Sequence, residues 1–286
     1  MPSMEINFIY ILFLSLIGFI ISFIGGMVGL VLGIIRLPFI MSTGLSITES
    51  VGTNIGVSTL GAITAAIQHI KNKNIAFTIF LIMAITGAIS AFIGASLTKT
   101  VPINFFLILV GLIIAYESFI LLKDNIHIKR NNKINKKIND KDINEYYSSL
   151  SPKSIKHFYH DIFVQAVIGF LIGMLGGLVG LVLGSIRLPA IIKILKTDPK
   201  LAVGTNILIS SVMGLSGFGG HLIGNEVNFL YLIALGPSAM IGGFLGAKYT
   251  NRLSPLTLKK LIGIVLALVG AILFISPLIG FNIGYS

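Results

Sequence analysis

Long apolar runs separated by short polar stretches dominate the pattern of this chain. The runs lie at residues 7–41, 51–70, 75–98, 103–122, 162–192, 203–222, 229–247 and 259–280. A helix crosses the hydrocarbon core of a membrane with about 20 apolar residues. The pattern therefore predicts an all-α protein that passes through a membrane several times.

The runs 7–41 and 162–192 are too long for one crossing, and both contain the same interrupted sequence. Residues 25–40 read GGMVGLVLGIIRLPFI, and residues 176–191 match them at 13 of 16 positions. Glycine and proline both disfavour a continuous helix. We therefore expect the first helix to end at Ile24, before Gly25-Gly26, and each copy to form a glycine-broken helical hairpin.

The repeat continues beyond this stretch. Val51-Gly52-Thr53-Asn54 returns as Val203-Gly204-Thr205-Asn206. One architectural unit is therefore used twice. The predicted domains are a first transmembrane repeat at 1–122, a hydrophilic cytoplasmic connector at 123–160 and a second transmembrane repeat at 161–286. The connector is rich in Lys and Asn, and such a segment buries too little apolar surface to fold alone.

Two helix starts can be predicted from local sequence. Ser46 and Glu49 have the spacing of a capping box. Asp198 followed by Pro199 stands at the matching place in the second half, and it favours a helix start through an Asp cap and a Pro at the first helical position.

Composition and charge agree with a membrane protein. Hydrophobic residues make up 55% of the chain and charged residues 11%, and the mean hydropathy is +0.95. The net charge of +11 resides mainly in short loops, where Lys and Arg set the orientation of helices. We expect the lipid bilayer, not nucleic acid, to be the partner of these residues.

The loop charges distinguish two topologies. If each long run crosses once, the repeats are parallel and the faces carry eleven and eight Lys/Arg. If each long run is a hairpin that returns to the face it entered from, three crossings remain per half and the split is eighteen to one. The second split is the one that the positive-inside rule expects. We therefore predict two inverted repeats, each a hairpin plus three transmembrane helices, with both termini outside.

Arg36 and Arg187 are the strongest candidates for substrate binding, because neither has an acidic neighbour in sequence. An ionisable residue inside a membrane marks a functional site by default, and the guanidinium fork suits oxyanions. Two such forks related by a pseudo-two-fold axis would clasp one small anion. The alternative is that both arginines extend to the membrane interface.

Other candidate residues follow from the repeat. Glycine amides near a helix end suit anions, although glycine also favours helix packing. Thr and Asn side chains at helix starts are possible donors that compete with capping and interhelical bonds. The candidates are Gly25, Gly26, Gly29, Gly176, Gly177, Gly180, Pro38, Pro189, Thr53, Asn54, Thr205 and Asn206. His69 and His221 are matched by the repeat and are candidates for proton coupling. We expect no catalytic residue, metal or cofactor.

The doubled Gly-Gly and Pro pattern, each copy followed about 14 residues later by Gly-Thr-Asn, resembles the sulfite exporter TauE/SafE family of anion permeases. The resemblance covers the chain outside 123–160. It implies transport of small sulfur-containing anions, such as sulfite or organosulfonates, across the plasma membrane of a prokaryote.

The leading hypothesis is a secondary transporter, and three other classes of function are weighed against it. An anion channel and a membrane-embedded anion-binding protein stay open as alternatives. Any of these proteins could also self-associate into a homo-oligomer. An enzyme is disfavoured, because the chain has no Ser/His or paired-Asp arrangement and no His-Glu-x-x-His.

Overall fold

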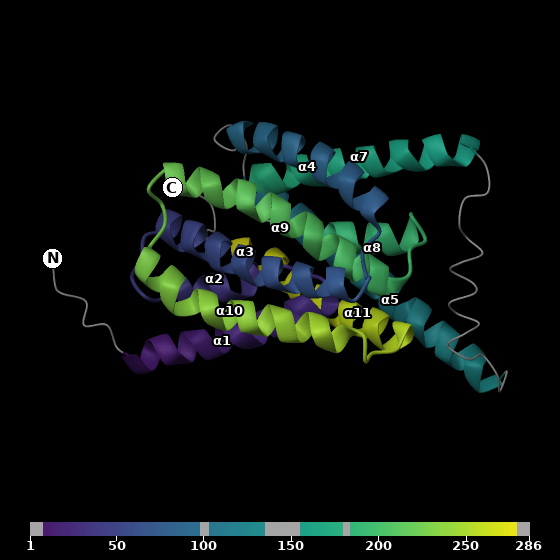
Figure 1. Ribbon diagram of the computed structural model, residues 1–286, viewed down its shortest axis with the longest axis horizontal. Coiled ribbons are helices and arrows are strands. Elements are labelled where there is room, and N and C mark those ends of the chain that lie inside the picture. The colour runs from purple at the N-terminus through teal and green to yellow at the C-terminus, as the bar shows by residue number, and fades with distance from the viewer. Residues whose placement is uncertain (1–7, 98–102, 135–154, 180–183, 279–286) are drawn as a thin grey trace.

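The computed structural model describes residues 8–97, 103–134, 155–179 and 184–278, and every regular element within these ranges is an α-helix (Figure 1). In chain order these are α1 (Phe8–Val28), α2 (Gly33–Met41), α3 (Ile47–Lys71), α4 (Phe77–Leu97), α5 (Ile103–Ile134), α7 (Ile155–Val179), α8 (Gly184–Lys193), α9 (Pro199–Ile223), α10 (Phe229–Thr250) and α11 (Pro255–Leu278). The all-α prediction is confirmed for the described ranges.

Five of the described helices, α1, α3, α9, α10 and α11, are long and apolar enough to cross a membrane. Shorter apolar stretches lie in α4 and α7. Ile9, Phe119 and Ile233 expose more than 60% of their surface. Large apolar side chains on the outside of a helical bundle are expected where lipid is the solvent. The protein is therefore a multi-pass membrane protein.

The first hairpin is broken later than the sequence suggested. Helix α1 continues to Val28, so the prediction that it ends at Ile24 is wrong. The chain turns at Gly29, whose φ of +76° lies in the left-handed region that glycine adopts readily. Helix α2 then runs back along α1. The Tyr10 hydroxyl lies against Ser42 Oγ, and Gly18 faces Arg36.

Gly26 serves helix packing instead of chain reversal. A Cβ atom at Gly26 would lie 2.4 Å from the carbonyl oxygen of Gly243 on α10. Helices α1 and α10 therefore approach each other closely at this point, as small residues permit in membranes.

Two helix pairs form opposite edges of the bundle. Helices α4 and α7 lie side by side along one edge, and α1 and α10 along the other (Figure 1). Helices α3 and α9 lie between these edges and pack against each other. The contacts also give their relative direction. The start of α3 meets the end of α9, where Gly52 lies against His221, and Thr59 meets Gly214 further along. Helices α3 and α9 are therefore antiparallel.

Helices α5 and α11 form a third antiparallel pair. Gly111 near the start of α5 packs against Phe274 near the end of α11. Further along α5, Ser118 Oγ donates to the carbonyl of Gly263 at 2.7 Å. These two helices also occupy matching places in the two halves of the sequence.

Both predicted helix caps are confirmed. Ser46 Oγ accepts from the N–H of Glu49, and the Glu49 carboxylate accepts from the N–H of Ser46. Asp198 Oδ1 accepts from the N–H groups of Lys200 and Leu201. Helix α5 continues to Ile134 and α7 begins at Ile155, so both helices extend into the segment predicted as a connector. The middle of that segment lies outside the described residues.

Candidate functional site: two buried arginines and a cavity

Arg36 lies on α2 and is held by α3. Its Nε donates to Asn54 Oδ1 at 3.0 Å, and its Nη2 donates to the Asn54 carbonyl at 3.2 Å and to Ser58 Oγ at 2.5 Å. Asn54 Nδ2 donates to the carbonyl of Gly33 at 3.0 Å. Asn54 thus holds the first turn of α2 and the arginine together.

Arg187 on α8 repeats this arrangement against α9. Its Nε donates to Asn206 Oδ1 at 2.7 Å, and its Nη2 donates to the Asn206 carbonyl at 3.2 Å and to Ser210 Oγ at 2.6 Å. Asn206 Nδ2 donates to the carbonyl of Gly184 at 3.0 Å and also to that of Gly29 at 2.7 Å. Asn206 therefore connects the second arginine to the tip of the first hairpin.

Both guanidinium groups are withdrawn from the surface. Arg36 and Arg187 are each 1% exposed, so the alternative in which they extend to the membrane interface is wrong. Lys193 forms an ion pair with Glu117, and His221 forms one with Glu226. Neither arginine takes part in them. A buried charge is costly without an opposite charge, and here only neutral acceptors offset that cost.

A small, partly open cavity adjoins Arg36. Its polar lining comes from Arg36, Ser22 and Ser58, and its apolar lining is contributed largely by the hairpin tip and the second half of α3. The full lining is Ile21, Ser22, Gly26, Leu30, Val31, Leu32, Gly33, Arg36, Ser58, Gly61, Ala62, Ala65 and Ile207. One of these lining residues, Ile207 on α9, belongs to the second repeat of the chain.

The predicted glycines of the first half lie around the hairpin tip. The carbonyl of Gly25 accepts from the N–H of Leu30 at 2.9 Å. Gly26 lines the cavity, and Gly29 makes the turn. Gly25 and Gly26 lie inside α1, so the helix start that faces the cavity belongs to α2 at Gly33.

The remaining hairpin residues lie at matching places. Pro38 and Pro189 lie inside α2 and α8, two residues after each arginine. Gly176 and Gly177 lie within α7. Gly180 lies outside the described residues.

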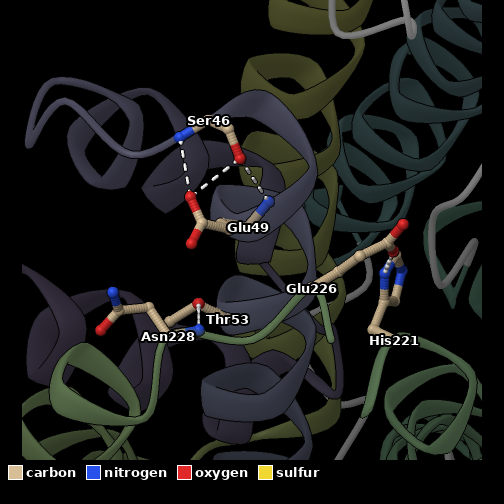
Figure 2. A network of polar contacts seen from close by, with 6 residues as sticks. All are labelled: Ser46, Glu49, Thr53, His221, Glu226 and Asn228. Atoms are coloured by element: carbon tan, nitrogen blue, oxygen red, sulfur yellow. Dashed lines mark hydrogen bonds and ion pairs between the residues drawn. The ribbon is translucent and has the colours of Figure 1, made fainter. Parts of the chain in front are cut away.

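The two predicted threonines bind the opposite half of the protein. Figure 2 shows Thr53 Oγ1 accepting from the backbone N–H of Asn228 at 2.9 Å, next to the Ser46–Glu49 capping box. Thr205 Oγ1 accepts from the N–H of Ala76, also at 2.9 Å. Each threonine thus fixes the loop that precedes a helix of the other half.

The two matched histidines have different surroundings. His69 is fully buried, and its Nε2 lies 3.0 Å from the carbonyl of Gly26. His221 Nδ1 lies 2.6 Å from Glu226 Oε2 at the opposite end of the bundle (Figure 2). Only His69 therefore contacts a residue of the cavity wall.

Ser58 and Ser210 were missed by the sequence prediction. Both contact an arginine, and they lie 152 positions apart, the same spacing as Asn54 and Asn206. Each serine also follows its asparagine by four residues, which places both on one face of a helix. The repeat spacing combined with helical periodicity was therefore a usable signal.

The apolar helices, the turn inside the bundle and the paired buried arginines define a helical membrane protein with a polar site in its interior. Residues 14–273 match the family model described as sulfite exporter TauE/SafE. The chain belongs to this family of membrane transporters.

Two relatives from Bacillus subtilis (strain 168) are similar over most of their length. One is named "Probable membrane transporter protein YunE"; it is 30% identical over 268 residues, which cover 90% of this chain and 94% of the relative. The other is named "Probable membrane transporter protein YdhB"; it is 25% identical over 265 residues, which cover 92% of this chain and 98% of the relative. No solved structure matches the chain.

Proposed function

We propose that this protein is a secondary transporter that exports small sulfur-containing oxyanions, such as sulfite or organosulfonates, across the plasma membrane of a prokaryote. The observation that carries the proposal is Arg36. Its guanidinium group is buried, takes part in no ion pair among the described residues and lines a cavity. An anion in this cavity would supply the missing negative charge.

Further groups in the cavity wall support an anionic substrate. Helix α2 starts at Gly33, and its N-cap residue Leu32 has no side-chain capping bond. The first N–H groups of a helix carry partial positive charge and suit anions. The hydroxyls of Ser22 and Ser58 add two donors with free rotation.

The proposed architecture is a pair of inverted repeats. The antiparallel packing of α3 on α9 and of α5 on α11 supports it, because these helices occupy matching places in the two halves. Inverted repeats with broken helices that meet within the membrane recur in secondary transporters. In this arrangement the two hairpins enter from opposite faces.

The proposed orientation places both termini outside. Asn74 Nδ2 donates to Asn251 Oδ1, and Lys200 Nζ donates to the Asn251 carbonyl. These contacts bring the loops after α3, before α9 and after α10 to one end of the bundle. The same end carries most of the loop Lys and Arg, so the positive-inside rule makes it cytoplasmic.

The proposal is tested by flux in proteoliposomes that contain the purified protein. Radiolabelled sulfite, sulfate and a small organosulfonate are supplied separately, and each flux is measured against substrate concentration. A transporter gives saturable flux and counterflow, which is exchange of external label for internal unlabelled anion. Flux that does not saturate and shows no counterflow would support a channel. Binding without any flux would support a membrane-embedded binding protein.

A further inference from the structure

The surroundings of Arg36 and Arg187 differ at one matched position. Gly61 on α3 and Met213 on α9 lie 152 positions apart, the spacing of the repeat. Met213 is 7% exposed, and its Sδ accepts a hydrogen bond from Arg187 Nη1 at 3.1 Å. Its thioether therefore covers the one guanidinium nitrogen that Asn206 and Ser210 leave open.

The matching nitrogen of Arg36 is uncovered. Arg36 donates through Nε and Nη2, and its Nη1 donates to none of the described residues. At the position of the methionine stands Gly61, which has no side chain to fill the space. Arg36, Ser58 and Gly61 all line the cavity.

We infer that the protein holds one anion subsite per chain, at Arg36, and that the residue at position 61 or 213 decides which arginine is open to an anion. Met213 plugs the space beside Arg187. This inference rests on the proposed function and replaces the expectation that two arginines clasp one anion.

The chemistry of the acceptors explains why an anion would bind at Arg36 and not at Arg187. A thioether is a weak, neutral acceptor, so Met213 occupies the donor without neutralising the charge. An oxyanion bound at Arg36 would accept from Nη1 and from the serine hydroxyls, and its charge would offset that of the guanidinium. The subsite thus suits a small oxyanion, and Arg187 acts as a positioning residue that links α8 to α9 and, through Asn206, to Gly29.

Equilibrium binding of [35S]sulfite to the purified full-length protein in detergent tests the inference through its stoichiometry. The wild-type protein is expected to bind one sulfite per chain. Met213→Ala removes the plug and is expected to raise the number to two. Met213→Leu keeps the volume filled without the sulfur, and it is expected to stay at one. Met213→Val is the second shortened variant if the alanine variant does not fold.

Arg36→Gln identifies which site is occupied. On its own it is expected to abolish binding, and combined with Met213→Ala it is expected to restore one sulfite per chain, now at Arg187. The exchange variant Gly61→Met with Met213→Gly is also expected to bind one sulfite per chain, at Arg187 and not at Arg36. Size-exclusion chromatography and thermal unfolding check the fold, because a Cβ at Gly61 would lie 3.1 Å from the Ala239 carbonyl oxygen.

Each of three outcomes would overturn the inference of a single subsite and leave the proposed function standing. They are two sulfites per wild-type chain, one sulfite with Met213→Ala and Met213→Val alike, or binding that survives Arg36→Gln but not Arg187→Gln. If no folded variant binds sulfite and the proteoliposomes show no anion flux, the proposed function itself fails instead.

Discussion

The hydroxyl of Thr53 accepts a hydrogen bond from the backbone N–H of Asn228, a residue 175 positions later in the chain (Figure 2). The matched bond from the N–H of Ala76 to Thr205 repeats this contact at the other end of the bundle. The Gly-Thr-Asn motif therefore has two roles. Its threonine binds the other half, and its asparagine holds the arginine of its own half.

Removing the threonine hydroxyl is expected to destabilise the contact between the halves. Thr53 is fully buried, and Thr53→Val leaves the N–H of Asn228 without its acceptor. An unsatisfied donor of this kind costs about 1–3 kcal/mol. Thermal unfolding in detergent measures the change, with Thr53→Ser as the control that keeps the hydroxyl. Equal stability of the valine and serine variants would show that the bond contributes nothing.

The glycine of the same motif is expected to be irreplaceable. A Cβ at Gly52 would lie 2.1 Å from the carbonyl oxygen of Glu226, and one at Gly204 would lie 2.0 Å from that of Asn74. These are backbone atoms that cannot rotate away, so Gly52→Ala and Gly204→Ala should each cost at least about 1–3 kcal/mol, as overpacking does.

Gly220 supplies the matched control for these substitutions. It lies in α9, and among the described residues no atom beyond its chain neighbours and the adjoining backbone of α9 lies within 4 Å of the place that a Cβ would take. Gly220→Ala is expected to be neutral or to stabilise the protein by roughly 0.5–1 kcal/mol, the usual difference between Ala and Gly in a helix. If Gly52→Ala and Gly204→Ala unfolded at the same temperature as Gly220→Ala, the close loop contacts would not explain the glycines at positions 52 and 204.

The proposed orientation can be mapped with single cysteines, because the chain has none of its own. Lys71→Cys and Arg252→Cys lie at the basic end of the bundle, and Thr43→Cys and Val227→Cys lie at the opposite end. In intact cells, a membrane-impermeant maleimide is expected to label only the second pair. Labelling of Lys71→Cys from outside would contradict the orientation, and labelling of one residue from each pair would contradict the inverted arrangement.

Proton coupling stays a prediction, and the structure separates its two candidates. His69 contacts the carbonyl of Gly26 in the cavity wall, whereas His221 is paired with Glu226. His69→Gln is expected to abolish stimulation of sulfite flux by a pH gradient while counterflow remains, and His221→Gln is expected to retain the stimulation. Loss of the stimulation in His221→Gln and not in His69→Gln would assign proton coupling to His221. Stimulation that persists in both variants would exclude both histidines from proton coupling.

The parts of the fold that depend on short-range sequence were predictable. The capping box at Ser46 and the Asp198 cap follow from neighbouring residues, and both are present. Glu117, an acid inside an apolar run, pairs with Lys193 on α8 at 2.5 Å. The sequence alone could not name that partner, because nothing local links the two residues.

The end of α1 and the cavity beside Arg36 depend on contacts between distant segments. The sequence offers three glycines for the break, Gly25, Gly26 and Gly29, and packing decides among them. A Cβ at Gly29 would lie 2.6 Å from Val203 Cα on α9, and the turn occurs there. The difference between Gly61 and Met213 is visible in the sequence, but its meaning depends on the bond from Arg187 to the thioether.

Counterflow of [35S]sulfite in proteoliposomes with the Arg36→Gln variant tests the central claim most directly. Arg252→Gln is the matched control, since Arg252 lies over the Tyr249 ring and is exposed. Wild-type and Arg252→Gln proteins are expected to show equal, saturable counterflow, and Arg36→Gln, folded by size-exclusion chromatography, is expected to show none. Wild-type counterflow in the Arg36→Gln variant would contradict the claim that this guanidinium group binds the transported anion.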